Sequence, residues 1–507
     1  MIREKLAAMP RSTLLSLKRG IEKESLRATP GGGLAMTPHS PALGSALTHE
    51  HITTDFSESQ LELITGVHPS AEACLEELER VHQFVYRNIG GEILWCASMP
   101  CNLPADDAIP IGQYGRSNSG RLKTVYRSGL AWRYGRRMQT ISGIHYNFSL
   151  QGMASESYFA LIRNFRRISW LPIYLFGASP AACETFVAGR PHELKSLSQG
   201  TLYLPHATSL RMGRLGYQSD AQASLAVSYN SLASYGASLY EALTVPYPPY
   251  EKIGIRGPDA DGPDSYRQLA TSLLQIENEF YTTIRAKRRT RRGERPLHAL
   301  RERGVEYVEV RLMDLDPFAP LGITAPTMRM LDLILLHCHL SESPHDTPQE
   351  LHAIARNKAN TAQRGREPGL ALERGAQKVG LSEWGRQILG ECEPIAAALD
   401  AALGGAAYRD ALAGALAVMR EPESAPSARV LHAMARNHND VYVRFVLAMS
   451  LLHQGTLKNG AFSKEAERYL VRLAEKSLVE QKQIEASDNV DFETYRARYL
   501  SPDLLKL

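Results

Sequence analysis

Cysteine is scarce in this 507-residue sequence, which contains six. No two of them form a CxxC pair, and no spacing matches a metal-binding finger. Disulfide frameworks are typical of short secreted chains, so a chain of this length is not expected to need one. We therefore expect the cysteines to be reduced thiols of a cytosolic protein; they stand at positions 74, 96, 101, 183, 338 and 392.

Long apolar runs and a strong net charge are also missing. The stretch LDLILLHCHL (331–340) is shorter than the roughly 18 apolar residues that a membrane helix needs. The N-terminal MIREKLAAMPRSTLLSLKRG has no apolar segment ahead of a small-residue cleavage site. The formal net charge of +4 points to no polyanionic partner. We therefore expect a cytoplasmic monomer that binds neither membranes nor nucleic acid.

What the sequence does contain is a globular composition, with 44% apolar residues and no internal repeat. Its alternating and helical hydrophobic patterns predict an α+β fold. We expect an α+β core over residues 1–325 and a mostly helical part over 326–507, packed on the core as one continuous unit. Strands are predicted at 21–26, 52–56, 60–65, 138–150, 273–281 and 305–311, and helices at 1–19, 70–89, 156–176 and 219–243.

Acidic residues stand close together on two of the predicted strands. Glu22 and Glu24 lie in IEKESLR, and Glu309 precedes Arg311 in GVEYVEVR. Because residues i and i+2 of a strand point to the same face, each pair presents two charges to one side. A packed sheet rarely tolerates this unless something neutralises the charge. A hard divalent cation is the simplest candidate, and Mg²⁺ in turn binds nucleotide phosphates.

Six residues on strand-like segments form a candidate metal site. Taken alone, each is explained as a solvated strand residue or as half of an ion pair. Taken together they are harder to explain in that way, because all lie beside apolar neighbours. Carboxylates with one imidazole suit Mg²⁺ or Mn²⁺ better than Zn²⁺, which favours cysteine and histidine. The six residues are Glu22, Glu24, Asp55, Glu62, His145 and Glu309.

A very basic segment, IRAKRRTRRGER (284–295), lies between two of the predicted strands. Such a run is typical of a nucleic-acid patch, of a solvated loop or of a phosphate-binding loop. No aromatic residues are interleaved with its charges, which disfavours nucleic acid. Arginine binds phosphate through two parallel hydrogen bonds, so we assign part of the segment to a triphosphate. The candidates are Arg285 and Lys287, together with Arg311 on the acidic strand.

Other candidate residues carry no clear signal on their own. Arg127 and Arg211 are able to bind a carboxylate or a phosphate, but a surface ion pair is an equally good explanation. Tyr126, Tyr217 and Tyr281 read as residues at the edge of a hydrophobic core.

Long motifs add a further argument. They include GIEKESLR, GSALTHEHITTDFSESQLELIT, YGRSNSGRLKTVYRSGL, RYGRRMQTISGIHYNFSL, YLPHATSLRMGRLGY, QIENEFYTTIRAKR and GVEYVEVRLMDLDPFAPLGI. These motifs, in this order, resemble those of the glutamate–cysteine ligases (γ-glutamylcysteine synthetases) of the proteobacterial type. The tail of the chain after residue 440 matches the family poorly.

The resemblance implies a fold and a set of site residues. The fold is a curved antiparallel sheet that forms an open barrel with helices outside, akin to the catalytic domain of glutamine synthetase. The family's metal ligands fall on the same six residues as the acidic-strand argument. Arg311, Arg211 and Glu309 fall at the reacting groups, with Arg311 at the γ-phosphate. The substrate-binding positions are Phe56, Tyr126, Arg127, Gln139, Asn147, Arg211, Tyr217 and Tyr281.

The implied reaction joins the γ-carboxylate of L-glutamate to the amine of L-cysteine, with ATP as co-substrate and Mg²⁺ or Mn²⁺ as cofactor. The main alternative is a γ-glutamyl ligase of the same family with a different amine acceptor. A phosphotransferase on a related fold would release no free phosphate. A polyanion-binding protein that uses residues 284–295 would leave the six metal-type ligands unexplained.

Overall fold

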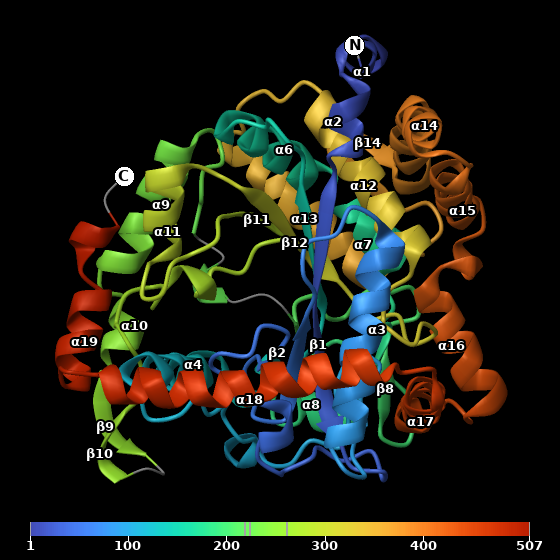
Figure 1. Ribbon diagram of the computed structural model, residues 1–507. Coiled ribbons are helices and arrows are strands. Elements are labelled where there is room, and N and C mark those ends of the chain that lie inside the picture. The colour runs from blue at the N-terminus through green and yellow to red at the C-terminus, as the bar shows by residue number, and fades with distance from the viewer. Residues whose placement is uncertain (1, 217–219, 223–224, 260–261, 506–507) are drawn as a thin grey trace.

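The computed structural model describes residues 2–216, 220–222, 225–259 and 262–505 (Figure 1). Its strands are β1 Lys18–Ala28, β2 Ile52–Thr54, β3 Gln60–Ile64, β4 Ile93–Leu94, β5 Ile144–Ser149, β6 Ala181–Cys183, β7 Lys195–Ser198, β8 Thr201–Tyr203, β9 Arg256–Asp259, β10 Gly262–Tyr266, β11 Ile284–Lys287, β12 Tyr307–Met313, β13 Ala371–Arg374 and β14 Gln377–Gly380.

The helices of the first half and the centre are α1 Ile2–Ala8, α2 Arg11–Leu15, α3 Ala71–Asn88, α4 Asn118–Tyr134, α5 Arg136–Gln139, α6 Ser155–Arg167, α7 Trp170–Phe176, α8 Glu184–Val187, α9 Leu232–Thr244, α10 Pro248–Glu251, α11 Pro296–Arg303 and α12 Ala325–Leu340. Those that follow are α13 Pro348–Arg364, α14 Leu381–Leu403, α15 Ala407–Arg420, α16 Pro426–Asn437, α17 Tyr442–Asn459, α18 Lys464–Ser487 and α19 Phe492–Tyr499.

The main sheet is antiparallel throughout and has seven strands. Its order is β11-β12-β5-β1-β3-β2, and β4 pairs with the end of β1. The sheet is not closed, because β11 and β2 remain as its edges. The mixed α/β architecture and the antiparallel sheet that the sequence predicts are therefore confirmed, and the open-barrel form stays a prediction.

The register of the sheet brings the predicted site residues of five strands opposite one another. Glu22 on β1 pairs with His145 on β5, and Glu24 pairs with Glu62 on β3. On the other side, Glu309 of β12 stands opposite Asn147 of β5 and Arg285 of β11. All of these lie on one face of the pleat, since facing partners in an antiparallel pair point the same way.

The opposite face of the sheet is buried and mostly apolar, although β1 also places Arg19 and Lys23 there, in contact with Asp332 and His82. Ile21, Tyr146 and Val310 are fully buried there in one continuous core. Helices α3, α6 and α7 contact this face, and α12 packs against α3 and α6 (Figure 1). Burying one large apolar side chain contributes about 1.5–3 kcal/mol. The helix layer therefore fixes which face of the sheet is left to line a cavity.

Most of the chain after residue 325 is helical, as the sequence predicts, apart from the β13–β14 hairpin. Residues of α12 and α14 belong to the same hydrophobic core as the main sheet. The division of the chain at residue 325 stays a prediction. Within the described residues, every helix is too short or too polar to span a bilayer.

Several element predictions differ from the structure. The strand predicted over 138–150 is limited to β5, the helix predicted over 156–176 divides into α6 and α7, and among the described residues of 219–243 the α-helix begins at Leu232. Residues 273–281 do not form a strand; they are irregular, with a short 3₁₀ turn at Glu277–Glu279. Side chains satisfy the backbone there instead of a strand partner, since the Gln275 N–H donates to the Glu279 carboxylate at 2.7 Å. The edge strand is β11, inside the basic segment. The helix predicted over 1–19 breaks at Pro10, because proline lacks the N–H that would continue it.

The prediction of six reduced thiols is also wrong in part. Cys101 and Cys183 form a disulfide with an S–S distance of 2.09 Å. Their separation of 82 residues gives no short-range spacing signal, and only the fold brings their Cα atoms to 5.1 Å. The other four cysteines are free and buried.

Candidate active site

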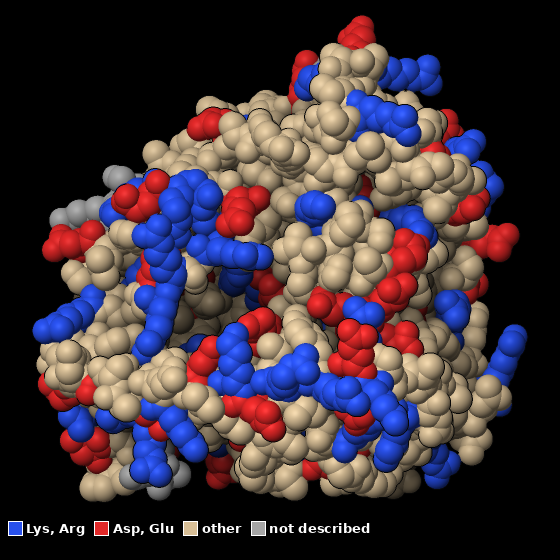
Figure 2. Space-filling model, in the orientation of Figure 1, with Lys and Arg blue, Asp and Glu red and all other residues tan. Residues whose placement is uncertain are grey.

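The charged face of the sheet forms the floor of a cavity of about 700 Å³. Figure 2 shows a hollow in this face of the molecule with lysine and arginine side chains around its rim. The walls come from α4, from the basic segment after β11, and from α18 and α19. Thirteen of the predicted site residues line the cavity: Glu22, Asp55, Phe56, Glu62, Tyr126, Arg127, Gln139, His145, Tyr281, Arg285, Lys287, Glu309 and Arg311.

Three of the predicted metal ligands lie close enough to share one ion. Glu22, His145 and Glu309 each offer one ligand atom, and these atoms lie within 4.8 Å of one another. Nδ1 of His145 is 3.1 Å from Glu22 Oε2 and 3.9 Å from Glu309 Oε1. Two carboxylates and one imidazole form a donor set that fits a hard divalent cation.

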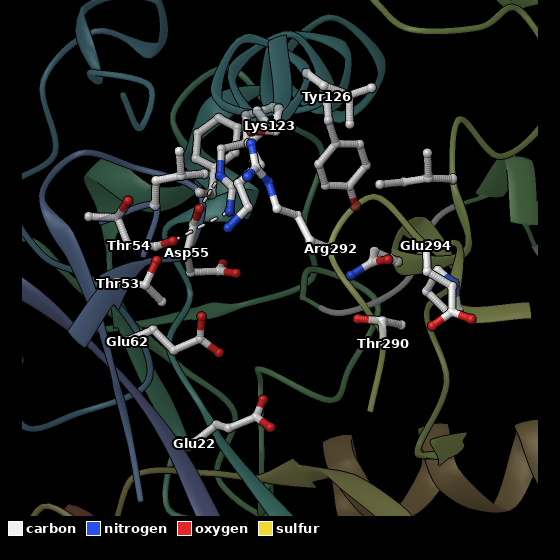
Figure 3. A pocket seen from close by; sticks show the side chains of 18 of the residues that line it. Glu22, Thr53, Thr54, Asp55, Glu62, Lys123, Tyr126, Thr290, Arg292 and Glu294 are labelled. Carbon is white, nitrogen blue, oxygen red and sulfur yellow. Dashed lines mark hydrogen bonds between the residues drawn. The ribbon is translucent and has the colours of Figure 1, made fainter. Parts of the chain in front are cut away.

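Carboxylates crowd the same end of the cavity. Burial, together with the Asp55 carboxylate, raises the pKa of Glu24 to about 8. Burial and the charges of Glu22, Asp55 and Glu24 raise the pKa of Glu62 well above its usual value. Figure 3 shows the carboxylates of Glu22, Asp55 and Glu62 on one side of the cavity. These groups need a proton or a cation to lie so close together.

Cations balance the carboxylate of Glu309. Lys287 Nζ and Arg311 Nη1 each lie 2.9 Å from one of its oxygens. Burial alone would raise the pKa of Glu309, but Lys287 and Arg311 hold it well below its usual range. Burial and the Arg311 charge lower the pKa of His145, which favours the neutral imidazole that a metal requires.

Three predicted residues lie behind the cavity rather than on its wall. Asn147 Nδ2 donates to Glu22 Oε1 at 2.9 Å. Glu24 accepts the Gly143 N–H at 2.7 Å, and its other oxygen lies 3.5 Å from His145 Nε2. Arg211 is fully buried and donates from Nη2 to the Arg311 carbonyl at 2.9 Å. These side chains therefore act on the cavity indirectly, by contacting the residues that line it.

The predicted acceptor residues gather beside α4. Gln139 Nε2 donates to the Tyr281 hydroxyl at 2.8 Å. Arg127 donates to the backbone carbonyl of Asp55, which fixes the turn between β2 and β3. Tyr126, the preceding residue of α4, also lines the cavity (Figure 3). Tyr217, also predicted here, lies outside the described residues.

Sequence reasoning missed several residues of the cavity wall. Lys123 precedes Tyr126 and Arg127 by three and four positions, so helical spacing alone could have found it. Gly143, which lies behind the wall beside Glu24, was also missed as a site residue although it stands in the quoted motif; a Cβ there would lie 2.0 Å from Arg211 Nη2. Four further missed residues gave no usable signal, because they lie far along the chain: Glu480, Ile484, Tyr495 and Tyr499.

The antiparallel sheet, with a carboxylate cluster next to paired cations, is an arrangement typical of enzymes that act on nucleotides. The family model described as glutamate–cysteine ligase matches residues 4–361. The chain belongs to the glutamate–cysteine ligase family.

Relatives extend the match along the whole chain. A glutamate–cysteine ligase of Alcanivorax borkumensis is 47% identical over 506 residues, which covers 96% of each chain. One of Bordetella petrii is 48% identical over 95% of this chain and 93% of its own.

Solved structures agree with the fold. A crystal structure of glutamate–cysteine ligase from Francisella tularensis in complex with AMP has a TM-score of 0.90 and 36% identity, and the match covers 96% of this chain and 98% of that one. A bifunctional glutathione synthetase from Pasteurella multocida has a TM-score of 0.64 at 22% identity, covering this chain completely and 57% of that chain. The second likeness concerns the fold alone.

Proposed function

We propose that this chain catalyses the ATP-dependent joining of the γ-carboxylate of L-glutamate to the amine of L-cysteine. The observation that carries the proposal is the pairing of Glu22, His145 and Glu309 with Lys287 and Arg311 on one sheet face, in a chain of the glutamate–cysteine ligase family. The AMP bound to the Francisella relative supports a nucleotide in the same fold.

The chemistry requires activation of the carboxylate. A carboxylate is a poor acyl donor because its leaving group would be oxide. Attack of a γ-carboxylate oxygen on the γ-phosphorus of ATP releases ADP and forms γ-glutamyl phosphate. The amine then attacks the acyl carbon, phosphate leaves with the bridging oxygen, and the amine loses one proton.

The acidic cluster provides the metal-binding part of this scheme. Glu22, His145 and Glu309 would hold Mg²⁺ or Mn²⁺, and we extend the site to Glu24, Asp55 and Glu62. The bound cation supplies positive charge against the phosphates and the incoming carboxylate. The raised pKa values of Glu24 and Glu62 support this extension, because a cation is able to take the place of their protons.

The arginines and lysines provide the phosphate-binding part. Arg311 and Lys287 lie on neighbouring strands and both reach Glu309, so they place positive charge where a γ-phosphate would meet the metal-binding residues. Arg285 lines the same wall. Arg211 is assigned to the activated carboxyl of glutamate. It contacts the Arg311 backbone and its charge lies near Glu24, which supports an indirect effect on the substrate through those two residues.

The acceptor site is assigned to Phe56, Tyr126, Arg127, Gln139, Tyr217 and Tyr281, of which Tyr217 lies outside the described residues, and Asn147 is assigned to the glutamate. The hydrogen bond between Gln139 and Tyr281 orients a hydroxyl beside the cavity. Oriented polar groups of this kind determine the direction from which the acceptor amine approaches.

The test is release of free phosphate with ATP, Mg²⁺ and glutamate, measured over a panel of amino-acid acceptors. The proposal predicts the highest kcat/KM with cysteine and acceptance of L-2-aminobutyrate, since the chemistry uses only the amine. A higher kcat/KM with a different amine would support the other γ-glutamyl ligase activity. Absence of phosphate with every acceptor would contradict both.

A further inference from the structure

The last helices of the chain border the cavity although they lie beyond the span of the family match, which ends at residue 361. Helix α18 runs across the front of the molecule in Figure 1, and α19 follows it and contacts α4. Four side chains of this C-terminal segment (residues 463–499) line the cavity: Glu480, Ile484, Tyr495 and Tyr499. The C-terminal segment therefore forms part of the cavity wall.

One side of the C-terminal segment is anchored to the loop before β2. The Ser45 N–H donates to Ser477 Oγ at 2.9 Å, and Thr48 Oγ1 donates to the Ser477 carbonyl at 2.6 Å. A Cβ on Gly44 would lie 2.4 Å from Ser477 Oγ and 2.8 Å from Ala474 Cα. This close approach, with a φ of +82° at Gly44, requires glycine.

The same segment also caps the start of α4, the helix that carries Tyr126 and Arg127. The Arg116 N–H donates to Glu485 Oε1 at 2.9 Å, and the Asn118 N–H donates to Asp488 Oδ2 at 2.5 Å. Carboxylates at this end of a helix are favourable, because the first backbone N–H groups have no partner within the helix.

The end of the segment reaches the basic side of the cavity through one residue, Arg295. Its side chain is 1% exposed. Nε donates to Glu277 Oε2 at 2.8 Å, and Nη1 donates to the Tyr499 carbonyl at 3.0 Å. The guanidinium also lies 5.1 Å from the centre of the Tyr499 ring. Arg295 thus joins α19 to the buried turn at Glu277.

Arg295 stands at the end of the exposed basic loop (residues 288–294) between β11 and α11. Arg291 and Arg292 of this loop line the cavity, and Figure 3 shows Arg292 extending into it. The loop is fixed at its start by the pairing of β11 with β12. At its other end, the Leu297 N–H donates to Glu277 Oε1 at 3.2 Å, beside the Arg295 pair. Arg303 also holds the loop, through Glu294 at 2.7 Å and the Arg289 carbonyl at 3.1 Å, and the Arg295 anchor fixes the buried end from which the loop extends.

We propose that the C-terminal segment is a wall of the active site and that Arg295 is the positioning residue that holds the basic loop over the bound triphosphate. The proposal rests on the proposed function for the identity of the ligand. In this proposal, Arg291 and Arg292 contact ATP, whereas Arg295 contacts no substrate. If Arg295 had only a structural role, its substitution would lower the thermal stability but would not raise the KM for ATP while leaving kcat unchanged.

The experiment uses Arg295→Lys, which keeps one charge beside Glu277 but cannot reach Glu277 and the Tyr499 carbonyl together. One lost hydrogen bond corresponds to about a two- to tenfold rise in the KM for ATP, with kcat and the KM for glutamate unchanged. Hydrogen exchange of residues 288–294, measured without substrate, becomes faster. The matched control is Arg364→Lys, since Arg364 pairs with Glu367 on an exposed helix end.

Glu277→Gln is the second variant, because it weakens the same pair from the other side while keeping an acceptor. Should Arg295→Lys fail to fold, the same changes are expected in Glu277→Gln. Unchanged exchange in the basic loop of the folded variants would overturn the proposal. Faster exchange with an unchanged KM for ATP would overturn it as well. If the wild-type protein showed no ligase activity, the proposed function would be contradicted. Faster hydrogen exchange of residues 288–294 in the variants would still show that Arg295 positions the basic loop.

Discussion

Glu309 is the residue at which the opposite charges of the site meet. It is 1% exposed, contacts Lys287 and Arg311, and belongs to the candidate metal cluster. Glu309→Gln removes its charge at almost constant volume. We expect ligation to fall by at least about 100-fold, the usual loss when one group that stabilises developing charge is removed. Initial rates at saturating Mg²⁺ measure the effect.

The control for this change is Glu302→Gln, since Glu302 is exposed and pairs only locally with Arg301. Both variants should give the circular dichroism spectrum of the wild type. Near-normal turnover of Glu309→Gln would show that the metal site is assigned wrongly.

Tyr281 is the residue at which the identity of the acceptor is tested. Its hydroxyl accepts a hydrogen bond from Gln139 inside the cavity. Tyr281→Phe removes a hydrogen bond worth roughly 0.5–1.5 kcal/mol, so the KM for cysteine should rise about two- to tenfold. The KM for ATP should change less. Tyr203→Phe, on strand β8 outside the cavity, serves as the control, and an unchanged KM for cysteine would remove Tyr281 from the acceptor site.

At the residue scale, strand alternation is sufficient to predict which charges share a face. The spacing of Glu22 and Glu24, and of Glu309 and Arg311, is a local property of a strand. The burial of Arg211 behind the cavity wall is different, because it depends on a close approach to Gly143 from a distant segment. Residue type alone does not distinguish a side chain on a cavity wall from one just behind it.

The charged strands predict a specific dependence on pH. An acid whose pKa is higher in the folded protein keeps an extra proton when folded, so the free energy of unfolding falls as pH rises between the two pKa values. For Glu24 this window runs from 4.5 to about 8. Glu22 and Glu309 have lowered pKa values and are ionised throughout pH 6–8, so they do not oppose the trend there.

Mg²⁺ should therefore raise the melting temperature more at pH 8 than at pH 6. The cation displaces a proton, and its affinity should increase about tenfold per pH unit for each proton displaced. Differential scanning fluorimetry with Mg²⁺ or EDTA measures this directly. Glu24→Gln should reduce the difference between the two pH values. An equal shift at both pH values would argue against a cation among these carboxylates.

At the scale of elements, the strands of the main sheet could be predicted where polar and apolar residues alternate, as in β1, β3 and β5. The failure at 273–281 has a physical cause. The carboxylates of Glu277 and Glu279 are buried and accept backbone N–H groups, which replaces strand pairing. Residues 284–287 were not predicted as a strand because they belong to a basic segment. Charged side chains are nevertheless compatible with this edge strand, since they line the wall of the cavity.

At the scale of the whole molecule, the cavity exists only because segments far apart in the sequence meet. The contact between Gly44 and α18 is the clearest case. Gly44→Ala would place a Cβ 2.4 Å from Ser477 Oγ and force a left-handed backbone on alanine, at a cost of about 1–3 kcal/mol. We expect a lower melting temperature and weaker substrate binding, because Leu47 and Thr48 line the cavity nearby.

Gly91→Ala is the matched control, since nothing lies within 4 Å of a Cβ at that position. Equal melting temperatures of the two variants would mean that α18 is not held against this loop as described. Contacts of this kind, like the Cys101–Cys183 disulfide, join residues whose separation leaves no local pattern. For this reason the floor of the site could be predicted from the sequence, whereas its C-terminal wall could not.

The most direct test of the central claim is transfer of oxygen from glutamate to phosphate. Glutamate labelled with ¹⁸O in its γ-carboxylate is incubated with ATP, Mg²⁺ and cysteine, and the released phosphate is analysed by mass spectrometry. Formation of γ-glutamyl phosphate followed by attack of the cysteine amine predicts one ¹⁸O atom in each phosphate, together with one γ-glutamylcysteine. Unlabelled phosphate, or label in phosphate without a γ-glutamyl product, would contradict the account.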